Sequence, residues 1–107
     1  MNRTTLRQAR MEDVDLILEL IRGLAEFEKL SHQVQVTREQ LQSTLFGARP
    51  AAEVVLAFDG ENVVGFAVFF ANFSTFLGKP GLYLEDLYVR PEFRGRGHGR
   101  ALLRHLA

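Results

Sequence analysis

Two β-rich segments on either side of the tetrapeptide DGEN set the main constraint on the fold. Residues 52–58 (AEVVLAF) and 63–73 (VVGFAVFFANF) are dominated by β-branched and aromatic side chains, and Asp59 and Gly60 lie between them. The Asp-Gly dipeptide favours a tight hairpin turn, because glycine takes up a positive φ without steric cost. The sequence therefore predicts an antiparallel hairpin near the middle of the chain.

The segments before this hairpin predict helices. Residues 4–9 (TTLRQA) are typical of a short strand, but in residues 10–30 apolar side chains recur every three or four positions, as on one face of an amphipathic helix. These side chains are Val14, Ile17, Leu18, Ile21, Leu24 and Ala25. Thr37 and Gln40 have the spacing of a capping box, which predicts a second helix that stops at Gly47.

After the hairpin, the sequence predicts a loop, a strand and a helix. Residues 74–81 (STFLGKPG) are rich in turn formers, residues 82–89 (LYLEDLYV) are typical of a strand that Pro91 ends, and a helix is expected from Gly99. The predicted order is β-α-α-β-β-β-α, an α/β (α+β) arrangement. No repeat, low-complexity tract or linker interrupts residues 1–107, so we expect a single domain.

Composition excludes several classes of protein. The chain has 107 residues, of which 47% are hydrophobic, and its 13 basic residues balance its 13 acidic residues. Such a chain is not a disordered polymer, and it lacks the overall positive field that gathers nucleic acid or anionic membrane. Without cysteine it has no disulfide and no thiolate. With no apolar segment typical of a signal peptide, we expect a cytoplasmic protein without nucleic-acid or membrane partners.

The segment RGRGHGR, residues 94–100, is the strongest candidate for a binding site. A strand that runs through glycines into a helix presents unpaired backbone N–H groups, which bind phosphate oxygens. A short glycine motif alone does not distinguish such a site from a surface turn. No lysine follows the glycines, as a P-loop requires, and a dinucleotide fingerprint belongs to a parallel βαβ unit. Arginine- and glycine-rich RNA-binding tails are repeated and disordered, whereas this segment occurs once between a strand and a helix.

The same segment resembles the acyl-CoA motif of the GNAT N-acyltransferases, [Q/R]-x-x-G-x-[G/A], with Arg94, Gly97 and Gly99 at its defined positions. Within that superfamily the chain is most similar to the diamine (spermidine/spermine) acetyltransferase branch. The segments that carry this similarity are LIRGLAEFEKL, VVGFAVFF followed by FLGKPGLYLEDLYV, and FRGRGHG, in the same order and at similar spacings. The resemblance covers nearly the whole chain.

The resemblance implies a GNAT fold with a mixed, largely antiparallel sheet and acetyl-CoA as the cosubstrate. In that family the pantetheine arm of coenzyme A bonds to the fourth strand, and its pyrophosphate lies on the amides of the glycine loop. By position, the pantetheine contacts would be Leu87, Tyr88 and Val89. The residues of the pyrophosphate loop would be Arg94, Gly95, Arg96, Gly97, His98, Gly99 and Arg100.

The resemblance also implies the chemistry, which is transfer of an acetyl group to a primary amine such as a polyamine. Glu85 stands at the position of the catalytic base, and Phe27 and Glu28 match an aromatic and acidic pair that, with Glu85, contributes to the amine site. From the residues alone, carboxylates in a strand are more often solvated than catalytic. Asp86 should point to the opposite face from Glu85, because side chains alternate along a strand.

The remaining polar residues favour direct attack of the amine on the thioester. No serine lies in a nucleophile elbow, and the three histidines, His32, His98 and His105, lack metal-ligand spacing, so we expect neither an acyl-enzyme nor a metal. The family's general acid is a tyrosine, and neither Tyr83 nor Tyr88 stands at its position.

GNAT domains continue with a fifth strand and further elements beyond the helix that follows the glycine loop. We therefore expect residues 1–107 to be the N-terminal portion of a longer acetyltransferase, or a chain that a partner completes, with the C-terminal strands absent. The alternative function is a non-catalytic module that binds coenzyme A or another phosphate ligand. The sequence leaves the identity of the amine open, and a homodimer is expected because members of this branch are commonly dimers.

Overall fold

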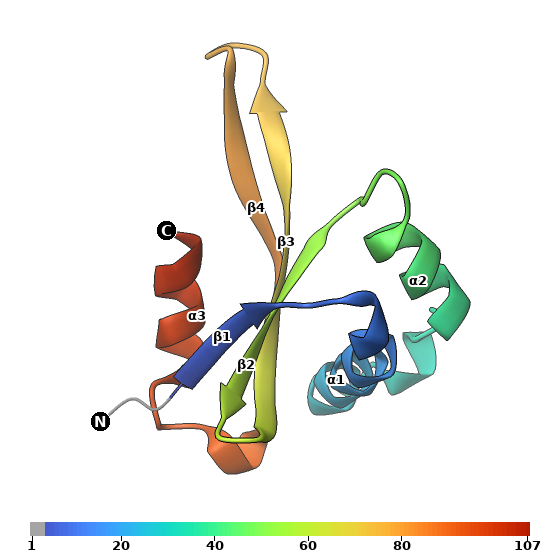
Figure 1. The fold of residues 1–107 in the computed structure, drawn as a ribbon, viewed down its shortest axis with the longest axis vertical. Helices are drawn as coiled ribbons and strands as arrows, with labels where there is room; N and C mark the ends of the chain where they lie inside the picture. The colour runs from blue at the N-terminus through green and yellow to red at the C-terminus, as the bar shows by residue number, and fades with distance from the viewer. Residues whose placement is uncertain (1–3) are drawn as a thin grey trace.

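The computed structural model describes residues 4–107 and shows a four-stranded sheet with helices on both faces (Figure 1). The strands lie in the order β1-β2-β3-β4, and each neighbouring pair is antiparallel. The elements are β1 (Thr4–Gln8), η1 (Met11–Asp13), α1 (Val14–Phe27), η2 (Ser31–Gln33), α2 (Arg38–Phe46), β2 (Glu53–Asp59), β3 (Asn62–Ser74), β4 (Lys79–Val89), η3 (Pro91–Phe93) and α3 (His98–Leu106), where η marks a 3-10 turn. The predicted order of strands and α-helices is confirmed.

Local sequence signals account for the central hairpin and for α2. Gly60 has a φ of 64° in the turn between β2 and β3, where Asp59 pairs with Asn62. At the start of α2 the Thr37 hydroxyl accepts a hydrogen bond from the Gln40 amide at 3.1 Å. The Gln40 side chain in turn accepts one from the Thr37 amide at 2.8 Å. Both predictions are confirmed. Each depends on contacts between residues at most three positions apart, so the local sequence is enough to specify it.

The helix predicted over residues 10–30 is shorter in the structure, since a 3-10 turn precedes α1. Asp13 closes this turn: its carboxylate accepts a hydrogen bond from the Arg10 amide at 2.7 Å and two from the Arg7 guanidinium at 2.7 and 3.0 Å. The bond from Arg7 holds the pKa of the Asp13 carboxyl below its ordinary value, although burial opposes the effect. A charged pair therefore joins β1 to the entrance of α1.

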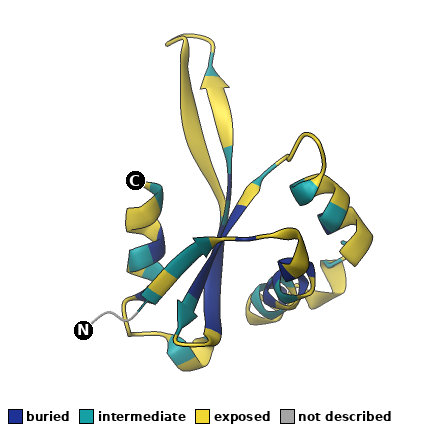
Figure 2. Ribbon diagram, in the orientation of Figure 1, coloured by how far each residue is buried: buried dark blue, intermediate teal, exposed yellow. Residues whose placement is uncertain are grey.

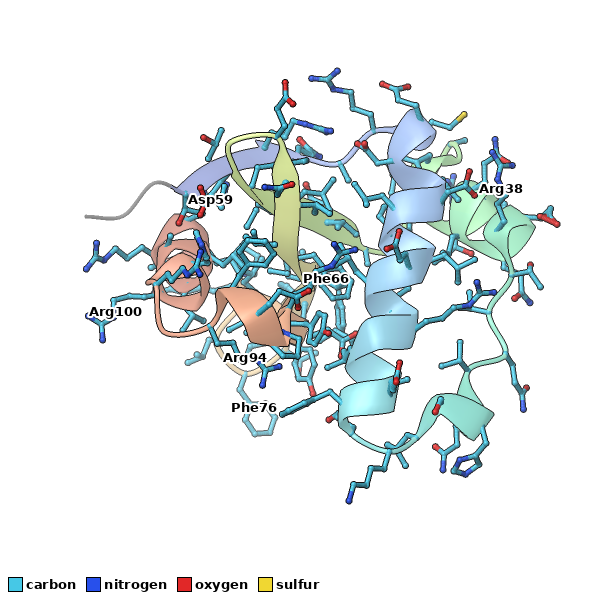
Figure 3. The ribbon with its side chains drawn as sticks, turned by 90° about the horizontal axis from the view of Figure 1, so that it is seen from below. Arg38, Asp59, Phe66, Phe76, Arg94 and Arg100 are labelled. Carbon is cyan, nitrogen blue, oxygen red and sulfur yellow. The ribbon has the colours of Figure 1, made fainter. Side chains whose placement is uncertain are left out.

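The central part of the sheet is buried on both faces. On one face α1 and α2 pack against side chains such as Leu56 and Phe66, and on the other α3 packs against Val64 and Ala67. In the view of Figure 3, Phe66 lies between α1 and α3. Adjacent strand residues thus enter different cores, which explains why β2 and the first half of β3 are continuously apolar. Among the side chains of these cores, Ile17, Phe66 and Leu102 are large and have no exposed surface.

The far ends of β3 and β4 form an arm that extends beyond the helices (Figure 1). Residues 74–81 were expected to be a loop, and this prediction is wrong at its edges: β3 continues to Ser74, β4 begins at Lys79, and Pro80 pairs with Phe73. A proline is compatible with β4 because β4 is an edge strand of the sheet in residues 4–107. The arm is mostly exposed, and the side chain of Phe76 at its tip is 99% accessible (Figure 2).

Two glycines make room for Tyr88 between the sheet and α1. A Cβ at Gly65 would lie 2.2 Å from the carbonyl oxygen of Tyr88, and one at Gly23 would lie 2.9 Å from its hydroxyl. The Gly65 contact is with backbone, which cannot move aside as a flexible side chain can. Gly65 therefore permits the close approach of β3 and β4 at the end of β4 that leads toward α3.

We expect Gly65→Ala to lower the free energy of unfolding by about 1 to 3 kcal/mol, the usual cost of overpacking. Urea denaturation measures this change in the free energy of unfolding. Gly78→Asn is the matched control: Gly78 lies in the turn of the arm with a φ of 63°, and a Cβ there would meet nothing within 4 Å. Asparagine tolerates this backbone conformation, so the control should stay within about 0.5 kcal/mol of the wild type. Equal stability of the two variants would contradict the steric explanation.

Candidate functional site

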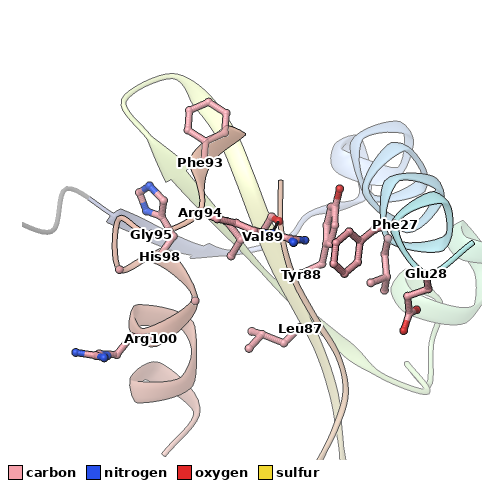
Figure 4. A pocket seen from close by; sticks show the side chains of 13 residues that line it. Phe27, Glu28, Leu87, Tyr88, Val89, Phe93, Arg94, Gly95, His98 and Arg100 are labelled. Atoms are coloured by element: carbon pink, nitrogen blue, oxygen red, sulfur yellow. Dashed lines mark hydrogen bonds between the residues drawn. The ribbon is translucent and has the colours of Figure 1, made fainter. Parts of the chain in front are cut away.

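A cleft of about 680 Å³ lies where the end of β4, the start of α3 and the end of α1 meet (Figure 4). Most of the residues that the sequence predicted to bind cofactor or substrate line it. The lining consists of Leu24, Phe27, Glu28, Leu87, Tyr88, Val89, Phe93, Arg94, Gly95, Gly97, His98, Gly99 and Arg100. Of the predicted residues, Glu85 and Arg96 are not part of this lining.

The cleft wraps around the edge of β4. Leu87 packs with the core under α3, whereas Tyr88 belongs to the core under α1. The Tyr88 ring meets Phe66 edge to face at 6.3 Å, and burial raises the pKa of its phenol. Within residues 4–107 no strand pairs with the outer edge of β4. The backbone of residues 87–89 can therefore bond a ligand that lies along this edge, as a strand presents N–H and C=O groups there.

At one end of the cleft, glycines shape the start of α3. Gly95 and Gly97 have φ values of 78° and 89°, in the left-handed region that other residues avoid. Gly97 is the N-cap of α3 and no side chain caps the helix, so the amides of the first turn are open to a ligand. These amides and the positive end of the helix dipole favour an anion such as phosphate. The structure therefore supports an anion site at the predicted residues.

The arginines of the loop have different surroundings. The Arg94 Nε donates a hydrogen bond to the carbonyl oxygen of Val89 at 2.8 Å, and its guanidinium lies 4.0 Å from the centre of the Phe27 ring. Arg94 thus fastens the loop to β4 and to the end of α1. Arg96 lies 5.5 Å from the ring of Phe93 and does not line the cleft. Arg100 lines it, but in Figure 4 its side chain points away from β4.

Acidic residues lie beside the cleft: Glu28 lines it, and Glu85 and Asp86 stand on β4 outside its lining. Glu85 is the extra residue of a β-bulge, because Val68 pairs with Asp86 and Phe69 with Leu84, which leaves Glu85 without a partner in the register. The prediction that Glu85 and Asp86 face opposite sides assumed regular alternation, and the bulge interrupts it.

Asp86 is half-buried. Burial is the main cause that raises the pKa of its carboxyl, and the negative charges of Glu85 and Glu28 raise it further. The charges of Glu85 and of Glu28, the residue that follows α1, both act on Asp86, so these carboxyl groups form an acidic cluster beside the cleft. Such a cluster attracts cations. Glu85 itself is exposed, and its role as a base stays a prediction.

Sequence reasoning missed two residues of the cleft, Leu24 and Phe93. The helical spacing of Leu24 indicated a core position, and Leu24 does pack against the core under α1 while also reaching the cleft. Phe93 stands in a short 3-10 turn, where no periodicity assigns a direction to its side chain. Neither residue carries a sequence signal for binding, since only the fold brings them to the end of β4.

Comparison with known proteins agrees with this geometry. Residues 17–107 match the model of the acetyltransferase (GNAT) family, and the chain belongs to this family. Thialysine N-epsilon-acetyltransferase of Mus musculus is 41% identical over 112 residues, which cover 97% of this chain and 65% of that protein. Spermidine/spermine N(1)-acetyltransferase-like protein 1 of Homo sapiens is 32% identical over 109 residues, covering 95% of this chain and 16% of that protein. The predicted family and branch are confirmed.

A solved structure shows the same fold. The crystal structure of an aminoglycoside acetyltransferase from an uncultured soil metagenomic sample, in complex with sisomicin, superposes with a TM-score of 0.80 at 20% identity. The match covers 96% of this chain and 66% of that chain. The chain spans 64–65% of the length of the mammalian thialysine acetyltransferases that it matches. In residues 4–107 we find no helix whose length and hydropathy would let it cross a membrane.

Proposed function

We propose that this protein transfers an acetyl group from acetyl-CoA to a primary amine of a small cationic molecule by direct attack on the thioester. The observation that carries the proposal is the cleft, which connects the open edge of β4 to the glycine-shaped start of α3. An anion site and a backbone edge in one cleft suit an extended ligand with a diphosphate at one end. Membership of the GNAT family supports acetyl-CoA as that ligand.

The residues present fit coenzyme A. The amides after Gly97 would hold the diphosphate, the absence of a side chain at Gly95 and Gly97 would allow its close approach, and the backbone of residues 87–89 would bond the pantetheine arm. Bound acetyl-CoA supplies an acyl group already activated as a thioester. The remaining task of the protein is to hold the amine and remove its proton.

An amine substrate must lose a proton before it attacks. An alkyl ammonium with a pKa of about 10.4 is neutral in only about one molecule in a thousand or fewer at pH 7, which costs roughly 4 to 5 kcal/mol. The carboxyl groups of Glu28, Glu85 and Asp86 would attract the cation, and Glu85 would accept its proton directly or through water. A base beside the cleft lowers the barrier by restoring the attacking form.

The names of the relatives favour a small amine with several positive charges. Thialysine and spermidine both carry primary amino groups, and they are substrates in the names of proteins similar to this chain. The acidic residues beside the cleft support the same class, and the Phe27 ring, which is 55% exposed although Arg94 lies over it, adds apolar surface for a methylene chain. We therefore propose a polyamine or a lysine-like amino acid as the acceptor.

Calorimetry combined with a thiol assay tests the function. We expect acetyl-CoA to bind with heat, and free thiol to appear when thialysine or spermidine is added to the protein and acetyl-CoA. Binding without thiol release for any amine of a panel would favour the non-catalytic coenzyme A module. Absence of binding would contradict both functions.

Glu85→Gln tests the proposed base. We expect the variant to lose about a hundredfold or more in kcat, the usual range for a general base, while the Kd for acetyl-CoA stays within about twofold. Steady-state kinetics at saturating amine measure the change. Glu53→Gln, an exposed carboxylate on β2, is the matched control and should leave kcat unchanged. A kcat of Glu85→Gln equal to that of the control would remove Glu85 from this role.

We further propose a cytoplasmic homodimer. The arm of β3 and β4 exposes Phe73, Phe76 and Leu77, which are 64%, 99% and 73% accessible, and exposed apolar side chains that lie together mark contact surfaces. Sedimentation equilibrium should give twice the mass of one chain. A single species with the mass of one chain at micromolar concentration would contradict the dimer.

A further inference from the structure

The imidazole of His98 points away from the cleft that its own backbone helps to form. His98 is the first residue of α3, immediately after the N-cap Gly97, so its amide belongs to the proposed anion site. Its side chain is only 3% exposed and lies on the opposite side, toward β1 and the end of β2. Burying a polar ring requires partners, because an unsatisfied buried polar group destabilises the fold.

Two polar partners surround the ring. The Nδ1 of His98 is 2.6 Å from the Thr4 hydroxyl on β1, and its Nε2 is 3.6 Å from a carboxylate oxygen of Asp59 at the end of β2. The ring of Phe93 stands edge-on at 6.4 Å. Asp59 lies beside the start of α3 in Figure 3. The side chain of His98 therefore joins α3 to β1, to the β2–β3 turn and to η3.

The two partners have different consequences for the two tautomers of a neutral ring. If Nδ1 accepts the proton of the Thr4 hydroxyl, Nε2 carries the ring hydrogen and directs it toward the Asp59 carboxylate. The reverse tautomer would direct a lone pair at that carboxylate. Nε2 has no hydrogen-bond partner within 3.5 Å, so Asp59 acts by charge rather than as a close hydrogen-bond acceptor. The Thr4 contact is therefore a hydrogen bond, and the Asp59 contact is a longer electrostatic one.

The start of α3 depends on such an anchor. The preceding loop contains Gly95 and Gly97, and glycine is the residue that restricts the backbone least. Further along, α3 is held by the fully buried Leu102 and by Leu106, one to two turns away from the first amides. Besides His98, the end of the helix that faces the cleft is held by the preceding loop, which Arg94 fastens to β4 and to Phe27.

We propose that His98 is a positioning residue, which with Thr4 and Asp59 fixes the first amides of α3 in the geometry that binds the diphosphate of acetyl-CoA. The identity of the ligand rests on the proposed function, but the anchoring of the amides does not. Asp59 thereby has a second role besides its place in the hairpin turn. Displacing amide donors by about 1 Å is enough to weaken an oriented site substantially.

Three substitutions test the proposal. His98→Phe keeps a planar ring and removes both polar contacts, whereas His98→Asn keeps a polar group near the position of Nδ1. Asp59→Asn removes the charge but retains a turn, because Asn-Gly also favours a tight hairpin. Leu41→Ala is the control: Leu41 is buried on α2, under the other face of the sheet, so its loss lowers stability without touching α3.

The first readout is hydrogen exchange of the ligand-free protein followed by NMR. We expect the amides of Ala101 and Leu102, which are hydrogen-bonded in α3, to exchange at least about tenfold faster in His98→Phe, and less so in His98→Asn and Asp59→Asn, while amides of α1 are unchanged. Leu41→Ala should show no selective change in α3. Exchange in α3 that is unchanged in all three variants would overturn the proposal.

The second readout is affinity for acetyl-CoA. We expect the Kd and the KM for acetyl-CoA to rise about tenfold in His98→Phe, as for the loss of about one hydrogen bond, with partial recovery in His98→Asn. The kcat and the KM for the amine should change by less than about threefold. If the wild type fails to bind acetyl-CoA, the proposed function is wrong, and hydrogen exchange still decides the role of His98. Equal affinities of wild type and variants would show that the anchor does not position the site.

Discussion

Burial of the central hairpin on both faces is the constraint on which the rest of the structure depends. Because β2 and β3 are covered by α1 and α2 on one side and by α3 on the other, the ends of these helices can meet only around the rim of the sheet. β4 forms that rim, and Gly65 allows it to lie close to β3. The cleft is therefore a consequence of how the sheet is sandwiched, with its main-chain groups supplied by β4 and α3.

Two kinds of electrostatic environment lie along the cleft. At the start of α3 the backbone amides favour an anion, whereas Glu28 in the lining and Glu85 and Asp86 beside it favour a cation. In the proposed transfer of an acetyl group from acetyl-CoA to a cationic amine, the first environment would hold the carrier and the second would attract the amine. The bulge at Glu85 marks the boundary between the regular part of β4 near the helices and the arm that extends from them.

Local signals predicted the elements of this fold well. The turn at Gly60 and the cap at Thr37 depend on a few neighbouring residues, so the sequence contains the whole cause. The positions of the glycine loop also followed from the sequence, through the motif and its place between a strand and a helix. The extent of the β3–β4 arm did not follow from the sequence. Pro80 is acceptable only on an edge strand, and which strand lies at the edge depends on the whole sheet.

By itself the sequence determined the order of elements, the family, and the loop whose amides face the cleft, since each of these is encoded by residues close together in the chain. Only the tertiary structure decided the directions of the side chains. It turned His98 inward to Thr4 and Asp59, placed Arg94 over Phe27, and added Leu24 and Phe93 to the cleft. The physical reason is that these contacts join residues from different elements, and their geometry exists only after both faces of the sheet have packed.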